Sequence, residues 1–236
     1  MNARPPRQLV LDIAPPPAYG SEDFLVAPSN QLAFQFIDQW PRWPSQTGLL
    51  VGPTGVGKSH LLEIWRRRSG GSNIKLSALT ERMVPELMPV NGAVALEHES
   101  GARIEEAALF HLINTARENR GSVLMAARAL PRMWGLALPD LISRLDAFPV
   151  IQIQPAEDEL LRAVLVKLFA DRQIIVDEWL VAYLMARMPR SLGDARQVVA
   201  AIDERTLAKG TGVTRAVAAR VLADLYDADL PSDDAG

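Results

Sequence analysis

The sequence predicts an α/β domain with a parallel sheet, followed by a small all-helical domain. Up to about residue 154, short apolar runs alternate with segments of helical periodicity. Beyond Pro155, every periodic segment has the helical spacing. Strands that alternate with helices are typical of a parallel sheet with helices on both faces. We therefore expect an α/β base at 21–154 and an all-α domain at 155–228.

The individual elements follow from periodicity and turn residues. Residues 22–40 are predicted to form a loop and a helix, with Ser29 or Asn30 as the N-cap. The apolar face of that helix carries Leu32, Phe36, Ile37 and Trp40. Strands are expected at 47–52, 74–79, 93–97, 122–127 and 150–154, and helices at 58–68, 104–119 and 140–147. In the second domain, helices are expected at 157–172, 177–187, 191–209 and 214–226.

The composition indicates a globular protein with a substantial core. The chain has 236 residues, of which 48% are hydrophobic, and a net charge of −3 that gives no general attraction to nucleic acid. Because there is no cysteine, disulfides and cysteine-ligated metal sites are excluded. No apolar run is long enough for a membrane helix, and Asp12 interrupts the N-terminal run that a signal peptide would need. A cytoplasmic protein without membrane contact is expected.

Both ends of the chain are expected to lie outside the two domains. Residues 1–20 form a flexible, proline-rich arm, and residues 229–236 form an acidic tail. The arm contains the apolar run RQLVLDI at 7–13, although its proline-rich flanks do not fold into a core. This run is either a strand that pairs with the chain's own sheet or a peptide that binds another protein.

The stretch GPTGVGKS at 52–59 matches the phosphate-binding P-loop, with a strand before it and a helix after it. Glycines let backbone N–H groups point at a β-phosphate, and the helix N-terminus adds partial positive charge. Lys58 is expected to reach the β- and γ-phosphates, and the Ser59 hydroxyl to ligate Mg²⁺. The predicted nucleotide contacts in this stretch are Gly52, Pro53, Thr54, Gly55, Val56, Gly57, Lys58, Ser59 and His60. The ligand is ADP or ATP, between which the sequence does not decide.

The predicted catalytic centre is incomplete. P-loop ATPases hold Mg²⁺ with an acid at the end of a neighbouring strand, and Glu97 in VALEHES fits that role, largely through water. A second acid normally follows, but His98 stands there, and Glu99 substitutes only if the strand end is bulged. A positioned general base is worth roughly 10²–10⁴ in rate. Nucleotide binding with weak or absent hydrolysis is therefore expected, unless this polar strand end has no role at all.

The order of these segments resembles a known family. The P-loop strand, the acid-ended strand, SVLMAARALPRM, LPDLISRLDAF and MPRSLGDARQVVAAID resemble the AAA+ region of the bacterial replication initiator DnaA over roughly residues 21–226. The closest resemblance is to the short Hda family, which acts in the regulatory inactivation of DnaA. It implies a P-loop AAA+ base with a helical lid, and it places FLVAPSNQLAF against the adenine.

The resemblance also implies roles for two arginines. Arg144 in LPDLISRL is the implied arginine finger, which acts in trans on the nucleotide of a neighbouring subunit. Arg190 in MPRSLGDAR is the implied sensor-II arginine, which contacts phosphates from the lid. The alternatives are an ion pair between Arg144 and a carboxylate such as Asp140, and a solvated Arg190.

One departure from the family pattern lies at the end of SVLMAA. The family often has a polar sensor-I residue there, whereas this chain has Ala126 and Ala127, followed by Arg128. The polar sensor is expected to be lost, which argues further against a self-sufficient ATPase.

The resemblance gives RQLVLDI a role as well. Peptides that bind the β sliding clamp of DNA polymerase begin with Gln and place apolar side chains in a groove, and the Hda family carries such a peptide near its N-terminus. The implied contacts here are Gln8, Leu9, Leu11 and Ile13, with Asp12 as a departure from the usual ending.

The expected function is a negative regulator of replication initiation that docks on the clamp and promotes hydrolysis of DnaA-bound ATP. A helicase-loader or remodelling ATPase is the alternative, and a small-molecule kinase is disfavoured by the helical second domain. Sequence-specific DNA binding is not expected, because GVTRAVAARVLADL contains only two arginines. The sequence leaves the oligomeric state open, including a homo-oligomer.

Overall fold

The structure is a computed structural model of the chain, and it describes residues 24–209 and 213–226. The predicted arm at 1–20, with its clamp peptide at 7–13, lies outside the described residues. The predicted acidic tail at 229–236 also lies outside them. The predictions on these segments therefore stay predictions.

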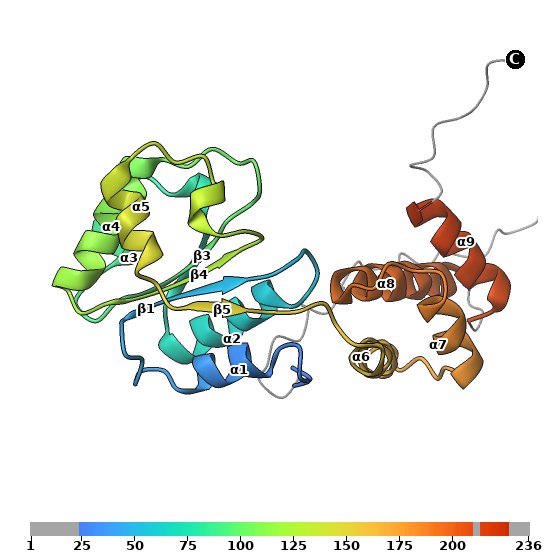
Figure 1. The fold of residues 1–236 in the computed structure, drawn as a ribbon. Coiled ribbons are helices and arrows are strands. Elements are labelled where there is room, and N and C mark those ends of the chain that lie inside the picture. Colours follow the sequence, from blue (N-terminus) through green and yellow to red (C-terminus); the bar gives the residue numbers. More distant parts are fainter. Residues whose placement is uncertain (1–23, 210–212, 227–236) are drawn as a thin grey trace, which may run out of the picture.

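The described part of the base contains a five-stranded parallel sheet in the order β2-β3-β4-β1-β5 (Figure 1). Its strands are β1 (Thr47–Val51), β2 (Ser72–Lys75), β3 (Ala93–Glu97), β4 (Ser122–Ala127) and β5 (Val150–Gln152). Strand β1 lies between β4 and β5. The strands β2, β3 and β4 therefore lie on one side of β1, and the last strand, β5, lies on its other side. Ligands of open α/β sheets bind at the carboxyl end of such a strand. The predicted α/β class is confirmed.

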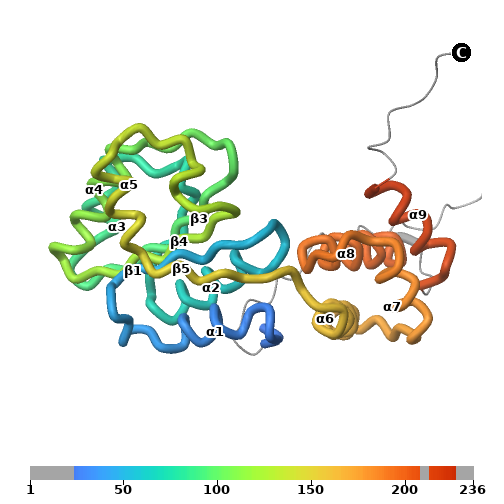
Figure 2. Tube along the Cα trace, viewed as in Figure 1, coloured from blue at the N-terminus to red at the C-terminus, as the bar shows by residue number. Residues whose placement is uncertain are grey.

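Helices cover both faces of this sheet (Figure 2). One face, called here the α2 face, is covered by α1 (Gln31–Asp38) and α2 (Lys58–Ser69). The other, called here the α4 face, is covered by α3 (Val84–Leu87), α4 (Glu106–Glu118) and α5 (Pro139–Asp146).

Successive strand residues alternate between the two faces. On β4, Leu124 and Ala126 pack in the core of the α2 face, whereas Met125 and Ala127 pack in the core of the α4 face. The same alternation continues at the strand ends, where the polar residues begin. The same alternation therefore tells whether a polar side chain at the carboxyl end of a strand lies on the α2 face or on the α4 face.

Two sequence-based predictions for the base were wrong. Leu32 was expected on the buried face of α1, but it is 69% exposed, and Ala33 and Ile37 are buried instead. The strand expected at 74–79 ends at Lys75, because a short 3₁₀ helix covers Leu76–Ala78. That turn directs both Leu76 and Leu79 into one core, whereas an extended strand would place residues three apart on opposite faces.

The lid is a helical unit with its own core. Its described helices are α6 (Asp158–Ala170), α7 (Glu178–Met185), α8 (Leu192–Lys209) and α9 (Arg215–Tyr226). Their apolar faces meet around Leu165, Phe169 and Val198, and Leu25 from the N-terminal loop packs against the same cluster. Figure 1 shows the lid beside the carboxyl edge of the sheet, connected to it by the segment after β5. Within the described residues, no helix has the length and apolar character needed to cross a bilayer.

Candidate functional site

The P-loop connects the carboxyl end of β1 to the N-terminus of α2. Gly55 and Gly57 have φ angles of +78° and +101°, a region that glycine enters without steric cost. Gly57 is also the N-cap of α2, so the first N–H groups of the helix open toward the loop. This combination of a glycine turn and a free helix N-terminus is an anion-binding geometry.

Lys58 lies inside this loop rather than in solvent. It is only 8% exposed, and its Nζ donates hydrogen bonds to the carbonyl oxygens of Gly52 at 2.7 Å and Pro53 at 2.6 Å. Burial lowers the pKa of Lys58, and the Glu97 carboxylate partly opposes that shift. A buried ammonium that is bonded only to neutral carbonyls is a group prepared for an anionic partner.

The structure brings Ser59 and Glu97 together, although they were predicted from separate segments. The Ser59 hydroxyl donates a short hydrogen bond to Glu97 Oε1 at the end of β3. A hydroxyl and a carboxylate are hard oxygen donors of the kind that Mg²⁺ prefers, together with phosphate and water. In the described part of the chain, no cluster of three or more His, Cys, Asp or Glu residues could hold a metal by itself. The pair therefore fits a magnesium ion that is shared with nucleotide phosphates.

His98 lies on the other side of the sheet from this pair. The alternation along β3 places it toward the α4 face, where its ring stacks on Trp134 with centroids 4.4 Å apart. It is 9% exposed, and burial lowers the pKa of its imidazole. His98 Nδ1 has no hydrogen-bond partner among the described residues. These contacts indicate a packing role for His98.

Glu99 is bound elsewhere at the edge of the sheet. Its carboxylate accepts hydrogen bonds from Lys75 Nζ at 2.7 Å and from Ser77 Oγ at 3.4 Å. The hydrogen bond from Lys75 is the main reason that the pKa of Glu99 is lowered. Glu99 therefore belongs to an exposed ion pair at the end of β2, and it makes no described contact with Ser59.

The N-terminus of α8 packs directly on the P-loop. The Gly193 N–H donates to the Gly55 carbonyl at 3.2 Å, and a Cβ at position 55 would lie 1.9 Å from Ser191 Oγ. Figure 1 shows the loop between β1 and α2 reaching this end of α8. Sequence reasoning missed Ser191 and Gly193, although a glycine in the first turn of a lid helix is a signal of close backbone approach.

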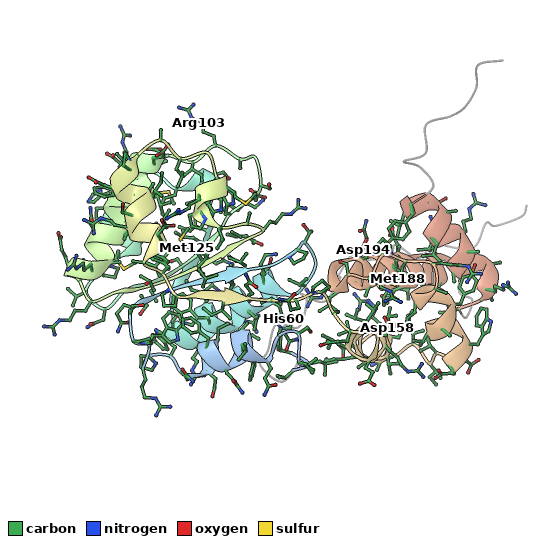
Figure 3. All side chains as sticks on the ribbon, in the orientation of Figure 1. His60, Arg103, Met125, Asp158, Met188 and Asp194 are labelled. Carbon is green, nitrogen blue, oxygen red and sulfur yellow. The ribbon has the colours of Figure 1, made fainter. Side chains whose placement is uncertain are left out.

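His60 also links the base to the lid. It is 3% exposed, its Nδ1 lies 2.9 Å from Arg196 Nη2, and the Phe24 ring meets its edge with centroids 5.2 Å apart. Figure 3 places His60 on the side of the base that faces the lid. The structure thus gives His60 a packing role under the P-loop, against Phe24, the first residue of the segment that the resemblance places against the adenine.

The loop before α1 is tied to the first lid helix. Ser29 donates to the Glu157 carboxylate through both its N–H and its hydroxyl, each at 2.8 Å. The backbone N–H of Glu157 itself and the Ser29 hydroxyl lower the pKa of that carboxyl. Asn30 is the N-cap residue, but its side chain bonds to Ala27 and Leu25 and so shapes the loop instead.

The two predicted arginines lie in different places. Arg190 is paired with Asp158 at 3.2 Å and its side chain is 70% exposed, and the sensor-II role implied for it stays a prediction. Arg144 is in the last turn of α5, with its guanidinium 5.0 Å from the centroid of the Phe110 ring. No ion pair joins Arg144 to Asp140 in the described structure. Because α5 covers the α4 face, Arg144 lies across the sheet from α2.

A parallel sheet in this order, a P-loop after β1 and a helical lid define the AAA+ fold. No model of a protein family matches the chain. In sequence, the chain is 26% identical over 192 residues to chromosomal replication initiator protein DnaA 1 of Chlamydia pneumoniae. That match covers 69% of this chain, and it spans 41% of the relative's length.

Solved structures with the same fold include domain III of the Thermotoga maritima replication initiation protein DnaA. The TM-score is 0.75 at 16% identity, and the match covers 89% of this chain and 97% of that one. AMPPCP-bound DnaA from Aquifex aeolicus matches with a TM-score of 0.62 at 17% identity, over 83% of this chain and 67% of that one. The chain therefore has the AAA+ fold of DnaA domain III and is similar in sequence to a replication initiator.

Proposed function

We propose that this chain is a nucleotide-binding AAA+ regulator of replication initiation, of the Hda type and cytoplasmic. It docks on the β sliding clamp through its arm and promotes hydrolysis of DnaA-bound ATP. The observation that carries this proposal is the position of Arg144. Its guanidinium lies on the face of the sheet opposite α2, the helix that follows its own P-loop, and it rests on the Phe110 ring rather than in an ion pair within the described chain. An arginine finger that completes a neighbour's site needs such a guanidinium.

The chain's own site supports binding of ADP or ATP. Lys58 can exchange the carbonyls of Gly52 and Pro53 for phosphate oxygens, which are stronger acceptors for an ammonium group. Ser59 and Glu97 would hold Mg²⁺, which supplies charge neutralisation at the phosphates. AMPPCP, an adenine nucleotide, is bound by the Aquifex aeolicus protein of the same fold. The loop around Ser29 and the packed His60 would border the adenine.

We predict that the purified protein turns over ATP slower than about 1 s⁻¹, at the bottom of the ordinary enzyme range. His98 is held against Trp134 on the α4 face, and Glu99 is held by Lys75, so neither is placed beside Ser59 as a general base. A steady-state ATPase assay, with the Lys58→Ala variant as the blank, measures this rate. A faster turnover, together with binding of single-stranded DNA, would favour the loader or remodeller alternative instead.

Clamp docking is tested with the variant Gln8→Ala/Leu11→Ala in the full chain. Burying one Leu side chain is worth about 1.5–3 kcal/mol. The Gln8 hydrogen bonds are lost as well, so clamp affinity is expected to fall by roughly tenfold to hundredfold or more. Surface plasmon resonance on immobilised clamp measures the affinity, and a parallel titration should show unchanged nucleotide binding.

Val10→Ala is the matched control, because it removes an apolar side chain from the same run that is not an implied contact. The control should bind the clamp like the wild type and accelerate the hydrolysis of DnaA-bound ATP, whereas the double variant should not. If the double variant keeps full clamp affinity, the arm is not the docking element.

A further inference from the structure

Helix α5, which carries Arg144, begins without a cap from its own sequence. Its N-cap residue is Leu138, which has no side-chain oxygen, and Pro139 follows at the first helical position. In a capping box, a Glu or Gln three positions after the N-cap accepts a hydrogen bond from the N-cap N–H. That position of α5 is Leu141, so the helix does not make this bond itself. The acceptor for the N–H of the half-buried Leu138 comes from another helix.

Glu106, in the first turn of α4, supplies that acceptor. Its Oε2 accepts a hydrogen bond from the Leu138 N–H at 2.7 Å, and the Ala137 N–H donates to both of its carboxylate oxygens at 3.0 Å. Hydrogen bonds to an ionised group are shorter and roughly twice as strong as those between neutral groups. One carboxylate from α4 thus holds two successive backbone N–H groups at the point where α5 begins.

The same side of α4 also contacts the last turn of α5. Phe110 follows Glu106 by four residues, and residues at this spacing lie on one face of a helix. The Arg144 guanidinium rests on the Phe110 ring, 5.0 Å from its centroid. Figure 1 shows α4 and α5 side by side. Helix α4 therefore contacts α5 at two points, one just before its first turn and one at the guanidinium.

The other contacts between α5 and the base fix its position less sharply. Two leucines of α5 pack in the core of the α4 face, but hydrophobic burial is non-directional. The ion pair of Asp146 with Arg132 joins two side chains at the surface, and such pairs contribute little. Among the described contacts, the hydrogen bonds to Glu106 are directional, charged and made to the α5 backbone itself.

We propose that Glu106 is a positioning residue for Arg144. Its carboxylate sets where α5 begins, and thereby where the guanidinium is presented to the nucleotide of a neighbouring subunit. This inference rests on the arginine finger of the proposed function. A displacement of about 1 Å at a reacting group can lower a rate about 10²-fold. Because Glu106 acts through the α5 backbone, its loss should slow the stimulated step and leave the assembly of the complex unchanged.

The test measures single-turnover hydrolysis of DnaA-bound ATP, with the clamp present, at increasing concentrations of the full chain. Glu106→Ala is expected to lower the rate at saturation roughly tenfold to hundredfold, with the half-saturating concentration unchanged within about twofold. Glu106→Gln keeps a carbonyl acceptor without the charge, so its rate should lie between those of Glu106→Ala and the wild type. The matched control is Glu105→Ala, which replaces the adjacent exposed glutamate, whose side chain makes no capping hydrogen bond, and it should keep the wild-type rate.

The two parameters separate positioning from a loss of fold. A partly unfolded variant contributes fewer active molecules, so it raises the half-saturating concentration and leaves the rate at saturation unchanged. A wild-type rate at saturation in Glu106→Ala, or an equal loss in Glu105→Ala, would overturn the positioning role while the loss in Arg144→Ala still stood. If the wild type gives no acceleration, or if Arg144→Ala accelerates fully, the proposed function fails and this inference fails with it. A lower rate at saturation in both Glu106 variants, with Glu105→Ala unaffected, supports the positioning role.

Discussion

Replacing Arg144 with alanine is expected to abolish the acceleration of DnaA-bound ATP hydrolysis, with a loss of up to 10³–10⁵ in the stimulated rate. A supplied arginine stabilises the charge that develops on the transferred phosphoryl group, and no other group of this chain is proposed for that role. The measurement is single-turnover hydrolysis of labelled ATP bound to DnaA, with the clamp and this protein present. The rate with Arg144→Ala should equal the rate without this protein.

The structure indicates how to separate this effect from misfolding. Arg144 is half-buried and contributes a cation–π contact with Phe110, worth about 0.5–2 kcal/mol, so its removal should not unfold the base. Arg144→Lys keeps the charge but not the planar fork, and it should also lose most of the acceleration.

Arg132→Ala is the matched control for Arg144→Ala. Arg132 lies next to the same helix, but its guanidinium is held by Asp146 at 2.8 Å. The control should keep most of the activity. If Arg144→Ala stimulates hydrolysis like the wild type, the arginine-finger assignment is wrong.

The parts of the fold that depend on local chemistry could be predicted from the sequence. GPTGVGKS fixes a turn with two left-handed glycines and a helix start, and the structure shows both. Apolar runs flanked by turn residues predicted the strands, except at 74–79, where the expected strand ends at Lys75 and the chain enters a 3₁₀ turn. The order of the segments along the chain carried the resemblance to DnaA, and the comparisons support a DnaA-like fold.

The contacts between distant segments could not be predicted in the same way. The stack of His98 on Trp134 requires the segment after β4 to fold back over β3, and no local pattern encodes that. The contact of Gly193 with Gly55 depends on how the lid meets the base. Such contacts are determined by tertiary packing, which is why His98 remained a candidate base at the level of sequence.

Replacing Lys58 with alanine is expected to reduce nucleotide affinity by about 2–5 kcal/mol, or roughly thirtyfold to several thousandfold. In the folded chain the ammonium is held by two carbonyls inside the P-loop, where it can pass directly to phosphate oxygens. Calorimetric titration measures the affinity. Thermal unfolding provides a second readout, because a ligand at one hundred times its Kd adds about 2.7 kcal/mol of stability. That gain should disappear in the variant.

Lys75→Ala is the matched control for Lys58→Ala. Lys75 is another lysine at the carboxyl edge, but it is exposed and paired with Glu99. Its replacement should leave both the nucleotide affinity and the ligand-induced stabilisation unchanged. Normal nucleotide affinity in Lys58→Ala would contradict the assignment of Lys58 to the phosphates.

The same lysine should not be required for folding. Burial lowers the pKa of Lys58 in the folded state, so the folded chain binds that proton less well than the unfolded chain does. The buried charge therefore costs stability below the folded pKa, and this cost decreases as the pH rises through it. Lys58→Met keeps the apolar stem and removes the charge, so at neutral pH the nucleotide-free variant should unfold at the wild-type temperature or above it. A lower unfolding temperature without nucleotide would mean that Lys58 supports the loop itself, and the loss of binding would then reflect a damaged P-loop.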